Sequence, residues 1–171
     1  SDLNTQAILS MRGSGYYSQK TVGAKIAIDA SKMLIEKAMK EIPKLKILHW
    51  YSRSFKKTLD NNGIERTNNL KELKAADINF LMVSDDVIKK ISKKIINKTF
   101  TVHSSGIHNL EELNNKGGKG VFYPIQTFSK VKDVEFKNLP ICIESDNKDD
   151  YLKLKKLVKL LGSKPVLMNS N

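Results

Sequence analysis

Short apolar runs that alternate with lysine-rich helical patterns constrain the fold of this chain more than any other feature. Each run is rich in β-branched or aromatic residues, and the candidate strands are Ala7–Met11, Lys46–Tyr51, Ile78–Val83, Thr99–Ser104, Gly120–Tyr123, Ile141–Ser145 and Pro165–Met168. The run Ile78–Val83 is apolar continuously rather than alternately, which is typical of a strand covered on both faces. Repeated strand and helix units of this kind predict a parallel sheet.

The segments between these runs carry the spacing of amphipathic helices. The first segment has apolar residues at helical spacing, namely Ile26, Ala30, Met33, Leu34, Ala38 and Ile42. Pro43 ends that pattern, while Asp85–Ile96 and Asp149–Leu161 repeat it and Asn68–Ala75 and Leu110–Asn115 are typical of shorter helices. We therefore predict an α/β fold of the three-layer, Rossmann-like type, with a mostly parallel sheet and helices on both faces.

The length of the chain indicates its number of domains, and its charge indicates its possible partners. With 171 residues, of which 40% are hydrophobic, the whole range 1–171 is expected to form one domain. The net charge of +12 comes mainly from lysine pairs spread along the chain, a pattern typical of solvated helix faces. Such an excess also attracts anionic small molecules, and nucleic acid is the less favoured partner because no aromatic residues are interleaved with a basic stripe.

The single cysteine and the hydropathy pattern indicate the compartment. Cys142 has no intramolecular partner and lies in a predicted buried strand, so an inert packed thiol is expected. The apolar runs are much shorter than a membrane span, and residues 1–20 lack the apolar core of a signal peptide. We expect a cytoplasmic protein without membrane contact.

A glycine-rich segment follows the first predicted strand. Gly13, Ser14 and Gly15 are placed where a tight turn would bring backbone N–H groups to a phosphate, next to the N-terminus of a helix. The third position of the usual fingerprint is Ser18 rather than glycine. A phosphate-binding loop and a plain surface turn therefore both remain open.

The second predicted strand ends in Ser52, Arg53 and Ser54. In dinucleotide-binding folds this position faces the adenosine ribose, and a basic residue there accepts the 2′-phosphate of NADP. A guanidinium matches a phosphate with two parallel donors. The segment favours NADP over NAD, although a solvated loop arginine is the alternative.

Two further predicted strands end in small polar residues, where ligands of open α/β sheets collect. They are Val83, Ser84 and Asp85 after one strand, and His103, Ser104, Ser105 and Gly106 at the end of the next. Asp85 is equally suited to capping the following helix, and His103 to a structural role. His103 and His108 make a poor metal pair because they are separated by a turn and have no third ligand, so no metal is expected.

Several motifs between Lys46 and Asn171 are shared with a known family. They are Tyr51–Ser54, Ala76–Ile78, Val83–Asp86, Val102–Gly106, Gly120–Ser129 and Leu139–Ser145. On these motifs the chain resembles Rossmann-like NADP oxidoreductases, also labelled coenzyme F420-dependent reductase-like, that carry a C-terminal domain of unknown function. The stretch Gly120–Ser129 is the most specific of them.

The resemblance implies an NADP site and a role for each matching segment. Gly13–Gly15 would match the phosphate loop, Ser52 and Arg53 the 2′-phosphate site, Val83–Asp85 the adenosine and nicotinamide wall, and Ser104–Gly106 the nicotinamide end. In the family a helical domain follows, dimerises and closes the substrate site. This chain ends where that domain would begin, so we expect a fragment or minimal version that binds rather than catalyses, with catalytic residues and oligomeric state unknown.

The N-terminal part, residues 1–45, departs from that family. Its segment Met11–Asp29 resembles the start of S-adenosylmethionine-dependent carboxyl methyltransferases, although their acidic, glycine-rich loop is missing after Pro43. If both resemblances hold, the sequence is a mosaic. Three functional hypotheses remain: an NADP-binding domain, a methyltransferase relic that binds S-adenosylmethionine, and a basic module for RNA or another acidic partner.

Overall fold

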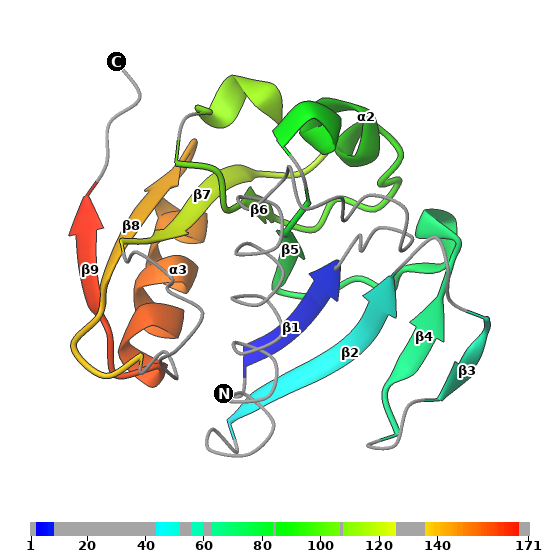
Figure 1. Ribbon diagram of the computed structural model, residues 1–171, viewed down its shortest axis with the longest axis horizontal. Helices are drawn as coiled ribbons and strands as arrows, with labels where there is room; N and C mark the ends of the chain where they lie inside the picture. Colours follow the sequence, from blue (N-terminus) through cyan, green and yellow to red (C-terminus); the bar gives the residue numbers. More distant parts are fainter. Residues whose placement is uncertain are drawn as a thin grey trace, which may run out of the picture.

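A computed structural model gives the fold of this chain (Figure 1). It describes residues 44–51, 56–59, 63–83, 85–106, 108–125 and 136–167, together with the backbone of residues 3–8. Nine described strands form one sheet in the order β3-β4-β2-β1-β5-β6-β7-β8-β9, so that β3 and β9 lie at its two ends. The predicted helix over 26–42 lies outside the described residues.

The strands and helices follow one another along the chain as the alternating pattern predicts. The strands are β1 (Leu3–Ile8), β2 (Leu45–Tyr51), β3 (Thr58–Leu59), β4 (Glu65–Thr67), β5 (Ile78–Leu81), β6 (Thr101–His103), β7 (Lys119–Pro124), β8 (Pro140–Ser145) and β9 (Lys164–Leu167). The described helices are α2 (Ile88–Lys93) and α3 (Lys148–Leu160), with short 3₁₀ turns at η2 (Leu70–Glu72), η3 (Asp85–Val87) and η4 (Leu110–Glu112).

Six neighbouring strands are all parallel and carry the order that defines the fold. From β4 through β2, β1, β5 and β6 to β7, every pairing is parallel, whereas β3 and β8 run antiparallel to their neighbours β4 and β7. Without the short β3, these six strands have the order 3-2-1-4-5-6 of the dinucleotide-binding folds. The prediction of a Rossmann-like, mostly parallel α/β fold is therefore confirmed.

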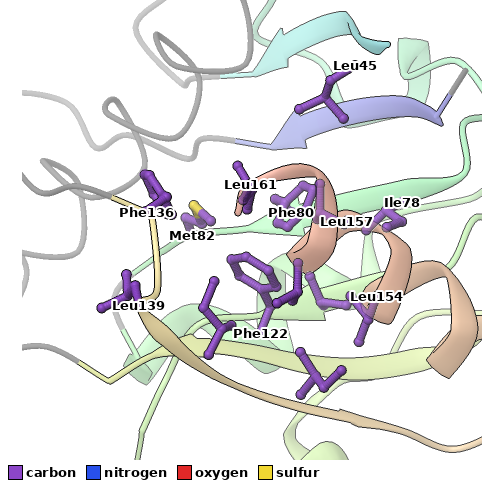
Figure 2. Close-up of a cluster of buried hydrophobic side chains, with 14 of the residues drawn as sticks. Leu45, Ile78, Phe80, Met82, Phe122, Phe136, Leu139, Leu154, Leu157 and Leu161 are labelled. Carbon is purple, nitrogen blue, oxygen red and sulfur yellow. The ribbon is translucent and has the colours of Figure 1, made fainter. Parts of the chain in front are cut away.

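Apolar side chains cover both faces of the sheet because successive residues of a strand point to opposite faces. In and after β5, Ile78, Phe80 and Met82 join one buried cluster, whereas Leu81 and Val83 join another. Figure 2 shows the first cluster, where the β5 residues meet Phe122 of β7 and Leu154 and Leu157 of α3. The second cluster includes Ile88 and Ile91 of α2, so described helices lie on both faces.

The helix α3 is specified by its own sequence. The Asn147 side chain accepts a hydrogen bond from the backbone N–H of Asp150 at 2.9 Å, which caps the N-terminus. Leu154, Leu157 and Val158 point inward at helical spacing. The helix stops before Gly162, whose φ of 72° is a left-handed conformation that glycine adopts without strain. The predicted helix Asp149–Leu161 thus corresponds to α3.

Several predicted elements are shorter or placed differently in the structure, among them the first strand and two short helices. The described first strand, Leu3–Ile8, begins earlier than the predicted Ala7–Met11 because its polar residues hide it from an apolar pattern; residues 9–11 lie outside the described residues. The two short helices shrink to single turns: the Asn69 and Asn109 side chains each accept from the N–H two residues on, and extended backbone follows at Leu73 and Leu113.

Two strands were missed, and one predicted helix is divided. β3 and β4 are two and three residues long, and β4 consists of Glu, Arg and Thr, so neither shows an apolar run. The predicted helix Asp85–Ile96 begins as the 3₁₀ turn η3 and becomes α2 only at Ile88. Among the described residues, no helix is both long and apolar enough to cross a membrane.

Two leucines of α3 provide a direct test of the first cluster. Leu157 is completely buried and Leu152 is 49% exposed, although both lie on the same helix. We predict that Leu157→Ala lowers the free energy of unfolding by about 2–5 kcal/mol, because it removes buried methyl groups and leaves a cavity. Leu152→Ala should change it by about 0.5 kcal/mol. Urea unfolding measures both, and equal losses would contradict this packing.

Candidate functional site

The carboxyl ends of three central parallel strands meet at one edge of the sheet. Ile8 of β1 is paired with Leu81 of β5, and Leu81 is paired with His103 of β6. The strand order reverses between β1 and β5, because β2 lies on one side of β1 and β5 on the other. In open α/β sheets ligands bind in the crevice outside such a reversal. This edge is therefore the candidate site.

The segment after β5 forms one wall of this edge. Met82 and Val83 are buried, and Asp85 opens the turn η3 with a side chain that is 43% exposed. The N-cap position of α2 is Val87, and no side chain caps that helix. Asp85 therefore does not cap α2, and its carboxylate lies at the edge of the sheet. Ser84 lies outside the described residues.

The segment after β6 is organised by His103, which is completely buried. Its Nδ1 accepts a hydrogen bond from the backbone N–H of Ser105 at 3.0 Å. Nε2 lies 2.9 Å from the carbonyl oxygen of Asn109 and, because Nδ1 is an acceptor, carries the hydrogen and donates it. Burial lowers the pKa of His103, although the bond to Asn109 acts in the opposite direction. The neutral ring is thus hydrogen-bonded to the backbone of the loop at both Ser105 and Asn109.

The small residues of this loop also make specific contacts. The Ser104 hydroxyl donates to the carbonyl oxygen of Phe122 at 2.6 Å, and the Ser105 hydroxyl oxygen accepts from the His108 N–H at 3.3 Å. Gly106 is exposed, and a Cβ at this position would lie only 2.6 Å from Cζ of Tyr123. The loop is therefore fixed in place and presents backbone without a side chain at Gly106.

His108 lies between Asp85 of the first loop and Glu112, and so joins the two loops. His108 Nε2 lies 3.9 Å from Oδ2 of Asp85, and His108 Nδ1 lies 4.0 Å from Oε1 of Glu112. In the sequence, His108 stands out only as a possible metal ligand with His103, because no sequence signal shows that it meets Asp85 from another loop. No group of three potential metal ligands occurs among the described residues.

The remaining predicted site residues lie outside the described residues. They are Gly13, Ser14 and Gly15 after β1, and Ser52, Arg53 and Ser54 after β2. The strands that precede them are described, and both end at the candidate edge, β1 at Ile8 and β2 at Tyr51. The structure thus brings together Val83, Asp85 and His103–Gly106.

No family model matches the chain, and no curated protein matches it. Similarity appears among solved structures instead. A protein assigned as an NADP oxidoreductase, from Bacteroides fragilis, is 23% identical with a TM-score of 0.67, over 99% of this chain and 61% of that one. Prephenate dehydrogenase from Aquifex aeolicus is 16% identical with a TM-score of 0.63, over 97% of this chain and 61% of that one.

A third similar structure is pyrroline carboxylate reductase from Plasmodium falciparum with NADP bound, which is 12% identical. Its TM-score is 0.57, over 98% of this chain and 58% of that one. At these identities the likeness establishes the fold alone, which is of the Rossmann type. The chain spans about three-fifths of the length of these structures.

The buried state of His103 predicts how stability depends on pH. Because its pKa in the folded chain lies below the ordinary value of 6.5, the unfolded chain takes up the proton more readily. The contribution of His103 to stability should be complete above pH 6.5 and should decrease as the pH falls below it.

Urea unfolding between pH 7.5 and 5 checks this prediction in the wild type and in His103→Gln. The pKa of His49 is also lowered, and both proteins share that contribution. The wild type should therefore lose more of its unfolding free energy on acidification than the variant. Parallel pH dependence in the two proteins would show that His103 does not contribute in this way.

Proposed function

We propose that this chain is an NADP-binding Rossmann domain of an oxidoreductase, with the dinucleotide held across the carboxyl ends of β2, β1, β5 and β6. The observation that carries the proposal is the order β4-β2-β1-β5-β6-β7, in which the reversal at β1 opens a ligand crevice. The likeness to nicotinamide-dependent oxidoreductases supports it.

The residues at this edge suit a long, flat, anionic ligand. Ser104 is partly exposed and Gly106 is exposed, so a cofactor can reach this loop although Ser105 is buried. The loop is held by four hydrogen bonds that involve its own residues, so binding would order few additional groups. The net charge of +12 favours an anionic ligand over a neutral one.

The strand order indicates which residues would bind each part of the dinucleotide. Gly13–Gly15 come after β1 and would hold the pyrophosphate through backbone N–H groups. Ser52, Arg53 and Ser54 come after β2 and would hold the adenosine ribose and its 2′-phosphate, which favours NADP over NAD. Val83, Ser84 and Asp85 would line the middle of the cofactor, and Ser104–Gly106 its nicotinamide end.

His103 would act on the cofactor indirectly. Both of its ring nitrogens are bound to the backbone of the loop, at Ser105 and Asn109. It is therefore a positioning residue that fixes Ser104–Gly106 rather than a group that contacts the ligand. A bound NADPH would supply a hydride, and this chain would supply its binding and orientation.

The alternatives make different binding predictions. A methyltransferase relic would bind S-adenosylmethionine, which the similar structures do not support. A basic module for RNA or another acidic partner would bind polyanions with a steep dependence on salt and would be indifferent to dinucleotides.

Arg53→Ala tests the assignment of the 2′-phosphate. The variant should weaken binding of NADPH by about tenfold or more while changing NADH binding little, because only NADPH carries the phosphate that a guanidinium would pair with. Lys116→Ala is the matched control: it also removes one positive charge, but from an exposed position before β7, at the opposite end of the parallel strands. It should leave both affinities nearly unchanged.

Thermal-shift titration gives the readout, because a ligand that binds only the folded state raises Tm. Wild-type protein should be stabilised by NADPH more than by NADH, and not by S-adenosylmethionine. If Arg53→Ala weakens the binding of both dinucleotides equally, Arg53 does not bind the 2′-phosphate. Stabilisation by S-adenosylmethionine alone would overturn the proposed function.

A further inference from the structure

Tyr123 lies beside the candidate site and has no role in the function proposed so far. It is the fifth residue of β7, in a strand that pairs in parallel with β6 through His103 and Val121. Tyr123 is therefore two residues further along than the partner of His103, at the level of the loop Ser104–Gly106. The phenol ring contacts this loop at Gly106.

The contact with Gly106 is close enough to determine which residue can occupy that position. A Cβ on Gly106 would lie 2.6 Å from Cζ and 2.9 Å from the hydroxyl oxygen of Tyr123. Real Cβ atoms do not approach other atoms so closely, so an alanine would push the ring away. Gly106 and Tyr123 thus form one surface, in which the absence of a side chain admits the phenol.

Core packing does not account for the tyrosine. Tyr123 is only partly buried and belongs to neither of the two apolar clusters, whereas its neighbour Phe122 is completely buried. Its hydroxyl makes no hydrogen bond to any residue that the structure describes. A partly buried tyrosine normally uses its hydroxyl as well as its ring. As far as the described residues go, the hydroxyl is available to a ligand at the carboxyl edge of the sheet.

The strand order shows which part of a dinucleotide would reach this position. Arg53 follows β2, on one side of β1, whereas Gly106 and Tyr123 belong to β6 and β7, on the other side. A ligand with its adenosine at β2 must cross β1 and β5 before it meets them. The nicotinamide riboside half is the part that lies at that distance.

We infer that Tyr123 and Gly106 together bind the nicotinamide riboside half of NADP, with the Tyr123 hydroxyl hydrogen-bonded to it and the phenol ring packed beside it. This inference rests on the proposed function. Tyr123 is then a ligand-contacting residue, and Gly106 positions its ring. The tyrosine of the specific stretch Gly120–Ser129 thereby gains a chemical role.

Two ligands make it possible to test this inference separately from the proposed function. NADPH contains the nicotinamide riboside half, whereas adenosine 2′,5′-bisphosphate lacks it but keeps the adenosine and the 2′-phosphate. Isothermal titration calorimetry of the wild type, Tyr123→Phe, Gly106→Ala and Tyr151→Phe measures both affinities without any reaction. Tyr151 is a matched control because it is a partly buried tyrosine on α3, packed against the first cluster.

We expect Tyr123→Phe to lower the affinity for NADPH by about fivefold, the effect of one lost hydrogen bond. Its affinity for adenosine 2′,5′-bisphosphate should stay within about twofold of that of the wild type. Gly106→Ala should weaken NADPH at least as much by displacing the ring. Tyr151→Phe should change neither affinity. Circular dichroism and the Tm of each variant establish that it is folded.

Other affinities would contradict the inference. Unchanged NADPH affinity in both Tyr123→Phe and Gly106→Ala would overturn the inference, and so would equal weakening of the two ligands. In either case the binding of both ligands by the wild type would leave the proposed function standing. If the wild type binds neither ligand, the proposed function itself fails, and the inference fails with it.

Discussion

The parallel pairing of β1 with both β2 and β5 is the constraint on which the rest of this structure depends. Parallel neighbours cannot be joined by a tight turn, so each connection must cross a face of the sheet. One consequence is that both faces carry apolar clusters, with α3 on one and α2 on the other. The other is the reversal of strand order beside β1, which brings the carboxyl ends of β1, β5 and β6 to one edge of the sheet, where ligands of open α/β sheets bind.

Most of this architecture could be predicted from the sequence, because it depends on apolar periodicity. Strands such as β2, β5 and β8 carry apolar runs, and α3 carries both its cap and its stop. What escaped prediction had no such signal. β1 has polar residues at three of its six positions in a strand that is paired on both sides, and β4 is three polar residues long, so only the whole sheet specifies them.

The candidate site was predictable only in part, for a different physical reason. Small polar residues after buried strands pointed to Val83–Asp85 and His103–Gly106, and the parallel register brings these segments to one edge. The contacts within the edge depend on residues distant in sequence. No local pattern shows that Tyr123 covers Gly106, that His108 meets Asp85, or that both nitrogens of His103 are bound by its own loop.

The central claim is that the ligand lies across the carboxyl edge of the central strands. Two-dimensional ¹H–¹⁵N NMR during titration with NADPH tests it most directly, because every backbone N–H reports on its own surroundings. A ligand bound there changes the shifts of Val83–Asp85 and Ser104–Gly106 most, while Gly117 and Gly118, before β7 at the opposite edge, stay unchanged. Changes confined to the lysine-rich outer face of α3, or no changes at all, would contradict it.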